Sequence, residues 1–204
     1  AKQALRDVTF NVAEGEIMGF LGPNGAGKTT TMNILTGYLS ATSGTARIDG
    51  VDVLEKPLLA KSKIGFLPEQ PPLYMDMTVK EYLNFVYGLK NCRLPRAQHI
   101  KEICEVVRIS DVYGRIIKNL SKGYRQRVGI AQALIGNPKV LIFDEPTVGL
   151  DPKQIIEVRE LIKELGKKHT VILSSHILTE ISAVCDHVFI LSKGKLVASD
   201  STEH

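Results

Sequence analysis

GPNGAGKT, residues Gly22–Thr29, is the stretch that decides the fold of this 204-residue chain. It fits the pattern G-x-x-x-x-G-K-[ST], in which glycines let consecutive backbone N–H groups turn toward one anion. Lys28 can place a positive charge on the β- and γ-phosphates of a nucleotide, and the Thr29 hydroxyl can ligate a Mg²⁺ that bridges them. The stretch therefore predicts a phosphate-binding loop.

The residues on both sides of this loop favour a strand before it and a helix after it. Glu16–Leu21 is a short apolar run, and apolar residues recur at helical spacing from Lys28 to Leu39. Such a helix would aim the positive end of its dipole at the bound anion. A glycine-rich turn with an unrelated lysine is the alternative, and these flanks weigh against it.

Length and composition fit one large globular domain or two small ones. The chain is 44% hydrophobic and 24% charged, and its net charge of +4 gives no strong electrostatic reason to expect nucleic acid as a partner. Cys92, Cys104 and Cys185 form no C-x-x-C pair, so neither a disulfide framework nor a zinc site is indicated. With no signal peptide and no apolar run near ~20 residues, we expect a cytoplasmic location.

The order of the expected elements predicts an α/β fold. Val8–Val12 alternates as a half-exposed antiparallel strand would, and Asp49-Gly50 is a hairpin turn signal. The middle of the chain carries helical spacing in Val79–Leu89, Arg96–Val107 and Ser121–Ile135. Strands and helices then alternate, with strands expected at Val140–Phe143, Thr170–Leu173 and Val188–Leu191 and helices after Asp151 and near Leu178–Val184. This alternation is typical of a parallel sheet covered by helices.

An acidic pair follows the first of these later strands. Asp144 and Glu145 come directly after the apolar run Val140–Phe143, which is typical of a strand buried on both faces. Since carboxyl ends of parallel strands face the ligand crevice, Asp144 can hold Mg²⁺, and Glu145 can orient or deprotonate the attacking water. A pair that only ends the strand is the alternative, and the phosphate loop upstream weighs against it.

Two further positions gain weight from their place in the chain. Ser121 is a suitable N-cap, and a helix N-terminus offers N–H groups to an anion, although alone this predicts only a capped helix. His176 follows the strand Thr170–Leu173 and should lie at the ligand edge of the sheet, where we expect it to be functional.

Taken in order, these segments resemble the nucleotide-binding domain of an ABC transporter over nearly the whole chain. Gly22–Thr29 is similar to Walker A, Leu120–Tyr124 to the LSGGQ signature, and Val140–Glu145 to Walker B with its catalytic glutamate. The other similar segments are the D-loop at Val148–Asp151, the switch histidine at His176 and the Q-loop region at Gly65–Tyr74. The last is most like ATPase subunits of exporters in the gliding-motility and multidrug group.

The resemblance implies a single ATP-binding cassette over residues 1–204. It would have a P-loop NTPase core with a mostly parallel sheet, an N-terminal antiparallel β subdomain and an inserted helical subdomain. The core would span residues 1–70 and 137–204, and the helical subdomain about 71–136. We also expect truncation at both ends, because the aromatic residue that stacks on adenine in this family lies upstream of the first strand.

The resemblance further implies that ATP with Mg²⁺ is bound between two such domains, paired head to tail as a homodimer or pseudo-dimer. Glu145 would activate water and His176 would contact the γ-phosphate. Nucleotide contacts would come from Gly22, Pro23, Asn24, Gly25, Ala26, Gly27, Lys28, Thr29, Thr30, Ser121, Gly123 and Asp151. Metal contacts would come from Thr29, Asp144 and Glu69. In this picture Ser121 and Gly123 serve the ATP held by the second copy.

A transmembrane permease is the other implied partner. It would insert a short helix beside Glu69–Tyr87 and hold the domain at the cytoplasmic face of the membrane, so that ATP binding and hydrolysis drive transport, with export favoured. No nucleic-acid partner is expected. A soluble ABC-type ATPase acting on ribosomes, DNA or protein assemblies is the second hypothesis, but such proteins usually carry two cassettes or long coiled coils. A P-loop kinase or GTPase would leave Ser121–Gly123 and His176 without a role.

The chain departs from the family pattern in two places. Lys122 and Tyr124 stand where the signature usually has glycine and glutamine, while Ser121 and Gly123 are kept. Glu69 aligns with the usual Q-loop glutamine, so whether a carboxylate or the neighbouring Gln70 serves the metal stays open.

Overall fold

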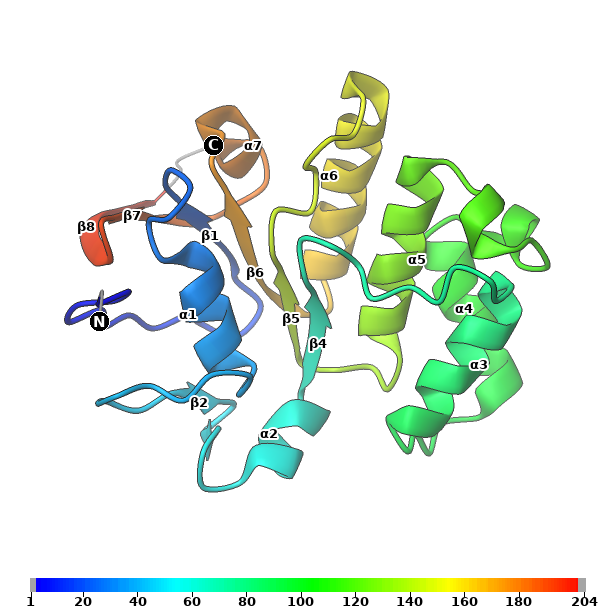
Figure 1. Ribbon diagram of the computed structural model, residues 1–204, viewed down its shortest axis with the longest axis horizontal. Helices are drawn as coiled ribbons and strands as arrows, with labels where there is room; N and C mark the ends of the chain where they lie inside the picture. The colour runs from blue at the N-terminus through cyan, green and yellow to red at the C-terminus, as the bar shows by residue number, and fades with distance from the viewer. Residues whose placement is uncertain (1–2, 202–204) are drawn as a thin grey trace.

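A six-stranded sheet forms the centre of the protein, whose computed structural model describes residues 3–201 (Figure 1). In spatial order its strands are β4 (Ile64–Leu67), β5 (Val140–Phe143), β6 (Thr170–Ser175), β1 (Ile17–Leu21), β7 (His187–Ser192) and β8 (Lys195–Ser201). The first five run parallel, and β8 adds an antiparallel edge. The expected mostly parallel sheet is confirmed. The expected truncation concerns the two chain ends, which lie outside the described residues.

Alternate side chains of the buried strands supply two separate cores, one on each face of the sheet. Val140 and Ile142 of β5 pack in a core with residues of α1 (Lys28–Leu35). Leu141 and Phe143 face the other way, into a larger core with α5 (Lys122–Leu134) and α6 (Pro152–Gly166). Because both faces are covered, β5 needs apolar residues at every position, as its sequence has.

Helices dominate the segment between β4 and β5. Here lie α3 (Val79–Leu89), α4 (Arg96–Val106) and α5, with two short 3₁₀ turns at Ser110–Val112 and Ile117–Asn119. Figure 1 shows α5 next to β4, with α3 and α4 on the side of α5 away from the sheet. The ammonium of Lys90 donates to carbonyls of Gln132 and Ile135, which fastens the end of α3 to the end of α5. The three helices were expected here and are confirmed, with ends shifted by a residue.

The remaining elements lie in the chain between α1 and β4 and between β6 and β7. They are a two-residue hairpin of β2 (Arg47–Ile48) and β3 (Val51–Asp52), the short helix α2 (Pro57–Ser62) and the short helix α7 (Leu178–Ser182). The hairpin turn at Asp49-Gly50 is confirmed. Sequence reasoning did not anticipate α2 or β8.

Two expectations about the N-terminal part are wrong. Residues Val8–Val12 form no strand, although Phe10 packs on Phe20 and Phe189 with ring centroids 5.0 and 5.5 Å apart. Alternating polarity indicates that one side of the segment is buried. A segment can be buried in this way without pairing with another strand. Helix α1 ends at Leu35 and not at Leu39, because the chain turns through Gly37 at a positive φ of 70°.

Candidate functional site

The glycine loop connects β1 to α1 and leaves the start of α1 open to an anion. Gly27 sits at the N-cap with φ 110°, and no side chain in the described chain caps the helix. Gly22 passes so close to β7 that a Cβ would lie 2.3 Å from the carbonyl oxygen of Leu191. The first N–H groups of a helix have no acceptor within it, so this loop presents several donors and a positive dipole end to one point.

The predicted loop lysine is buried inside this turn. Lys28 has only 5% of its surface exposed, and its ammonium donates to the carbonyls of Gly22 at 2.6 Å and Pro23 at 3.3 Å. Thr29 is exposed at the start of α1. Of the other expected loop residues, Asn24, Gly25 and Pro23 are exposed, Thr30 is half-buried and Ala26 is buried. The loop thus holds its charge in place while leaving its outer rim accessible.

The acidic pair lies at the same edge of the sheet, where β5 ends. Asp144 is 1% exposed, and one of its carboxylate oxygens accepts the hydroxyl of Ser174 at 2.5 Å. The same Ser174 oxygen accepts the backbone N–H of Glu145 at 2.9 Å. Ser174 was not singled out from the sequence. Its signal was the register of the parallel strands, which pairs Phe143 with Leu173 and so sets the next residues side by side.

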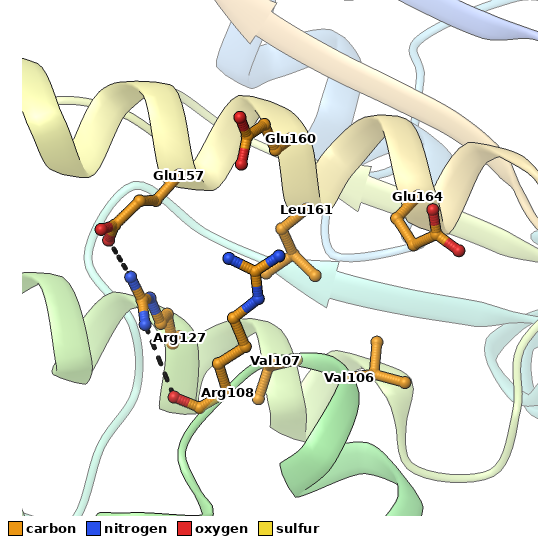
Figure 2. A pocket seen from close by; sticks show the side chains of 8 residues that line it. All are labelled: Val106, Val107, Arg108, Arg127, Glu157, Glu160, Leu161 and Glu164. Carbon is orange, nitrogen blue, oxygen red and sulfur yellow. Dashed lines mark hydrogen bonds and ion pairs between the residues drawn. The ribbon is translucent and has the colours of Figure 1, made fainter.

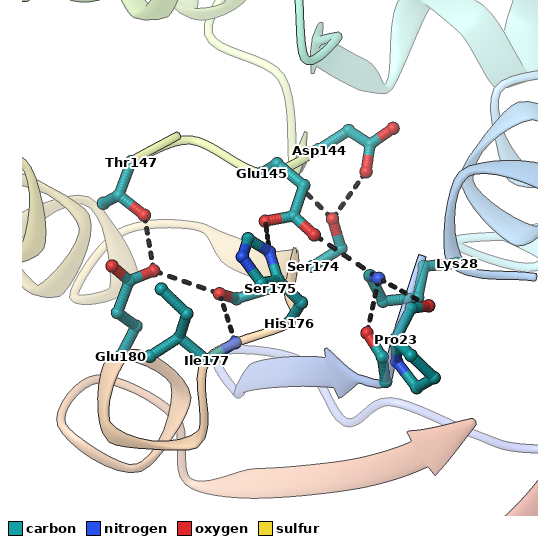
Figure 3. A network of polar contacts seen from close by, with 11 residues as sticks. Pro23, Lys28, Asp144, Glu145, Thr147, Ser174, Ser175, His176, Ile177 and Glu180 are labelled. Atoms are coloured by element: carbon teal, nitrogen blue, oxygen red, sulfur yellow. Dashed lines mark hydrogen bonds and ion pairs between the residues drawn. The ribbon is translucent and has the colours of Figure 1, made fainter. Parts of the chain in front are cut away.

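Glu145 lies between the loop lysine and the predicted switch histidine (Figure 3). Its Oε1 is 3.4 Å from the Lys28 ammonium, and its Oε2 is 3.0 Å from Nδ1 of His176. The backbone of Glu145 has φ 49°, a left-handed conformation that costs a non-glycine residue energy and is found mostly where function requires it. The structure therefore brings together three of the predicted side chains from β5, β6 and the glycine loop.

The residues present fit a magnesium nucleotide. Buried Oε1 of Glu145 accepts no hydrogen bond among residues 3–201 beyond its 3.4 Å ion pair with Lys28, and the start of α1 is uncapped, so both can take further polar partners. The described part of the chain contains no group of three or more His, Cys, Asp or Glu side chains that could hold a metal by themselves. This suits Mg²⁺, which in nucleotide sites is held by one or two protein oxygens together with phosphates and water.

The signature residues form a separate and more exposed feature. Ser121 caps α5 by accepting the N–H of Tyr124 at 3.3 Å, and its side chain is exposed. Gly123 is buried under Gln154, since a Cβ there would lie 2.5 Å from the Gln154 side-chain nitrogen. Within residues 3–201, no hydrogen bond joins Ser121 or Gly123 to Lys28 or Glu145.

The two departures from the signature pattern make contacts of their own. Tyr124 donates its hydroxyl to Asp111 at 2.6 Å, which ties the start of α5 to the preceding 3₁₀ turn. The Lys122 side chain lies over Gly149, where a Cβ would be 2.0 Å from its ammonium nitrogen. The exposed Asp151 caps α6 reciprocally with Gln154. The signature and the D-loop segment are therefore packed together within one chain.

The Q-loop candidates follow β4 at the same edge of the sheet as the site. Glu69 and Gln70 are exposed just beyond β4, which pairs with β5 in a register that sets Leu67 beside Phe143. In the described chain, neither Glu69 nor Gln70 has a hydrogen bond or ion pair to Thr29 or Asp144. The parallel pairing of β4 with β5 brings both residues to the edge of the sheet that carries Asp144. A metal contact from Glu69 or Gln70 stays a prediction.

A small hollow of about 220 Å³ lies elsewhere, between α4, α5 and α6 (Figure 2). Arg127 of α5 crosses it, pairing with Glu157 of α6 and donating to the carbonyl of Arg108 at 3.5 Å. The lining residues include none of the predicted site residues. We therefore regard this hollow as a packing feature between the helical segment and the sheet-covering helix.

Comparison with known proteins gives one consistent family. The profile described as ABC transporter matches residues 5–148. The uncharacterized ABC transporter ATP-binding protein YhcH of Bacillus subtilis is 40% identical over 94% of this chain and 63% of its own length. The bacitracin transport ATP-binding protein BcrA of Bacillus licheniformis is 38% identical over 100% of this chain and 67% of its own length. The chain thus spans less than two thirds of YhcH.

Solved structures agree with the sequence comparison. The dimeric structure of a post-hydrolysis state of the ATP-binding cassette MJ0796, bound to ADP and Pi, superposes with a TM-score of 0.87. It is 27% identical, and the match covers 98% of this chain and 91% of that one. A second structure, of the ATP-binding subunit of an ABC transporter, is 31% identical with a TM-score of 0.85 over 97% of this chain and 83% of that one.

Proposed function

We propose that this chain, which belongs to the ABC transporter family as an ATP-binding cassette, hydrolyses Mg-ATP and that this hydrolysis powers a membrane permease. The observation that carries the proposal is the placement of Glu145 between Lys28 and His176 at the mouth of the glycine loop. The left-handed backbone of this buried carboxylate, at a φ of 49°, supports a functional role, since such conformations cost a non-glycine residue energy and cluster at functional sites.

The first step in this proposal is binding of the triphosphate. The N–H groups at the start of α1 would take the β- and γ-phosphates, and Lys28 would exchange its carbonyl partners for phosphate oxygens. Thr29 and Asp144 would hold Mg²⁺, with Glu69 as a third candidate. The metal, when bound, neutralises charge that develops on the phosphates.

The second step is hydrolysis. Once Lys28 turns to phosphate, the Oε1 of Glu145 is free to accept a proton from, or orient, a water molecule in line with the γ-phosphate. His176, which lies 3.0 Å from Glu145 and has 41% of its side chain exposed, would contact the γ-phosphate itself. The Ser174 hydroxyl keeps Asp144 and the Glu145 backbone in fixed positions throughout.

A second copy of the domain would complete the site. Ser121 is exposed at the start of α5, with Gly123 buried beside it under Gln154, and neither has a hydrogen bond to the phosphate loop of its own chain within residues 3–201. We propose that they close over the ATP of the second copy, with Asp151 at the seam, in a homodimer or pseudo-dimer. The dimeric state described for the related MJ0796 cassette supports this arrangement.

The permease would bind on the helical segment, which we assign as a subdomain of about residues 71–136 inserted into a core of 1–70 and 137–204. Support comes from a cluster of exposed apolar side chains: Tyr74 stacks edge-on against Phe85 with centroids 5.2 Å apart, and Leu89 is exposed on the same helix. Among residues 3–201, no helix is long and apolar enough to cross a bilayer. We propose that this permease holds the cassette at the cytoplasmic face of the membrane.

Export is the direction that we favour. Residues 65–74 resemble the corresponding segment of exporter ATPases, and BcrA, a relative named for bacitracin transport, matches the whole chain. The docking surface, and not the direction of transport, is tested by co-expressing the chain with its permease. A double change, Tyr74→Ser with Phe85→Ser, should abolish its co-purification, whereas undiminished capture would contradict the docking surface.

The activity itself is tested by phosphate release from Mg-ATP. The purified chain should release phosphate, and the rate should fall on changing either Glu145 or His176. A protein that binds ATP without any turnover, alone or with its permease, would contradict the proposal.

A further inference from the structure

Glu180 is a buried carboxylate to which neither the proposed hydrolysis nor the sequence motifs give a role. It lies in the first turn of α7 with 7% of its surface exposed. Its Oε2 accepts two hydroxyl groups, from Thr147 at 2.6 Å and from Ser175 at 3.0 Å (Figure 3). Burying an ionisable group is costly unless it is well bonded, so this placement calls for a reason.

The two hydroxyl groups belong to the two segments that carry the reacting side chains. Thr147 comes two residues after Glu145, in the turn that leads to the D-loop segment. Ser175 immediately precedes His176, and its oxygen also accepts the N–H of Ile177 at 3.1 Å. One carboxylate oxygen therefore ties the chain after Glu145 to the chain around His176.

The turn after Glu145 is held from its other side by the signature helix. The side-chain amide of Gln126 in α5 donates to the carbonyl of Pro146 at 2.6 Å. Pro146 lies between Glu145 and Thr147, so a shift of α5 would be passed directly to the residues that Glu180 holds. Glu180 therefore connects the turn contacted by α5 to the segment that carries His176.

Stabilisation of α7 alone does not explain these contacts. A glutamate in a first helical turn gains from the helix dipole without any partner from another segment. Here both bonds run to side-chain hydroxyls, and one of them comes from a residue 33 positions away in the chain. The contact between Oε2 of Glu145 and Nδ1 of His176, at 3.0 Å, depends on the relation between the same two segments.

We propose that Glu180 is a positioning residue for ATP hydrolysis, which fixes the segment carrying His176 against the turn that follows Glu145. The inference rests on the proposed function, since it assigns Glu180 a role in that reaction. It acts through the Thr147 and Ser175 hydroxyls and touches neither nucleotide nor water. Loss of this link should slow the chemical step and leave binding of the triphosphate nearly unchanged, because Lys28 and the start of α1 are held by other contacts.

The test separates position from stability with two pairs of variants. Glu180→Ala removes the acceptor, and Glu180→Gln keeps an oxygen for both hydroxyls. Thr147→Val removes one hydroxyl at equal volume, and Thr147→Ser keeps it. Since small displacements of reacting groups cost up to about a hundredfold in rate, we expect kcat to fall by about ten- to a hundredfold in Glu180→Ala. Thr147→Val should follow in the same direction, while the Gln and Ser variants stay close to wild type and the Kd for Mg-ATP is unchanged in all four.

Asp186, an exposed residue, supplies the control. It is a second carboxylate in the same connection between β6 and β7, but it accepts the N–H of Ile17 at 2.8 Å, at the opposite end of β1. Asp186→Ala should lower the melting temperature without changing kcat for the folded fraction. Combining Thr147→Val with Glu180→Ala should cost no more than Glu180→Ala alone, because both remove one link.

The outcomes are distinct. An unchanged kcat in Thr147→Val and Glu180→Ala, or equal loss in Glu180→Gln and Glu180→Ala, would overturn the positioning role. If Glu180→Ala does not fold, Thr147→Val against Thr147→Ser decides in the same way. An absence of ATP turnover in the wild-type protein would instead contradict the proposed function, and the two failures are told apart by that one measurement.

Discussion

The glycine-loop edge of the sheet and the signature tip of α5 both carry nucleotide motifs, yet they are built in opposite ways. At the sheet edge, Lys28 and Glu145 are at most 6% exposed and are joined to each other and to His176. At the tip, Ser121 is exposed, and within residues 3–201 its side-chain oxygen accepts a hydrogen bond only from the N–H of Tyr124. We propose that the first region forms most of a nucleotide site within one chain, and that the second contacts a nucleotide held by another copy.

This difference teaches where each motif should act. A residue that is buried and bonded within its own chain can be assigned to binding or chemistry in that chain. We propose that Ser121, on an exposed helix start, meets its ligand through another molecule, since no hydrogen bond joins it to Lys28 within residues 3–201. Substitutions in the two regions should therefore give different patterns of affinity and turnover.

Glu145→Gln should have the largest effect. General base catalysis contributes about 10²- to 10⁴-fold, so we expect phosphate release to fall by that amount. Mg-ATP binding should persist, because the amide keeps the shape of the side chain and removes a competitor for Lys28. Phosphate release and calorimetry check the two parts, with the exposed Glu160→Gln as control. Normal turnover would remove Glu145 from its role.

Lys28→Ala should come next, and its effect should fall on affinity. A hydrogen bond to a charged group is worth about 1.5–3 kcal/mol, which corresponds to a rise in Kd for Mg-ATP of about ten- to a hundredfold. Calorimetry on the single domain measures it. The exposed Lys163→Ala should leave Kd as it is. An equal affinity in both variants would mean that the buried half-site is not where phosphate binds.

Ser121→Ala sharpens the contrast between the two regions. It should lower turnover by up to about tenfold, the value of one lost hydrogen bond, without changing the Kd of the single domain. Because Ser121 also caps α5, loss of stability is expected in addition. Thr78→Ala, which removes the cap of α3, controls for that loss and should not slow turnover. A weaker Kd in Ser121→Ala would place the tip on its own chain's nucleotide.

The smallest effect concerns pH and lies outside both regions. His99 is half-buried, burial lowers its pKa below the usual 6.5, and its Nε2 accepts the N–H of Gly136 at 3.0 Å. The unfolded chain therefore binds a proton more readily, so stability is retained above pH 6.5 and is lost as pH falls through the lower, folded value. In His99→Gln the loss of melting temperature between pH 7 and 5 should be smaller. An identical pH dependence would show that His99 contributes nothing.

Much of the fold was readable because its signals were local. The glycine loop, the apolar run before Asp144 and the N-caps at Ser121 and Asp151 each fix their surroundings within a few residues, and all are where the sequence placed them. The strand expected at Val8–Val12 was wrong, because half-burial of every second residue against the core, with Phe10 on the rings of Phe20 and Phe189, gives the same alternating pattern as a strand.

The contacts of the site were not readable in the same way. The links of Ser174 to Asp144 and of Glu180 to Thr147 join residues about thirty positions apart, and they depend on strand register and on the course of a turn. The left-handed backbone of Glu145 has no sequence signal at all, since the residue is not glycine. What the sequence gives is the list of chemical groups, and the sheet decides which of them meet.

The central claim is that ATP on the glycine loop of one copy is completed by Ser121 of another. A structure of Glu145→Gln with Mg-ATP, solved as the assembled protein, tests it most directly. We expect the γ-phosphate beside Lys28 of one chain to lie within hydrogen-bond distance of Ser121 and the Gly123 N–H of the second chain. A nucleotide-loaded assembly in which both helix starts face away from the phosphates would contradict it.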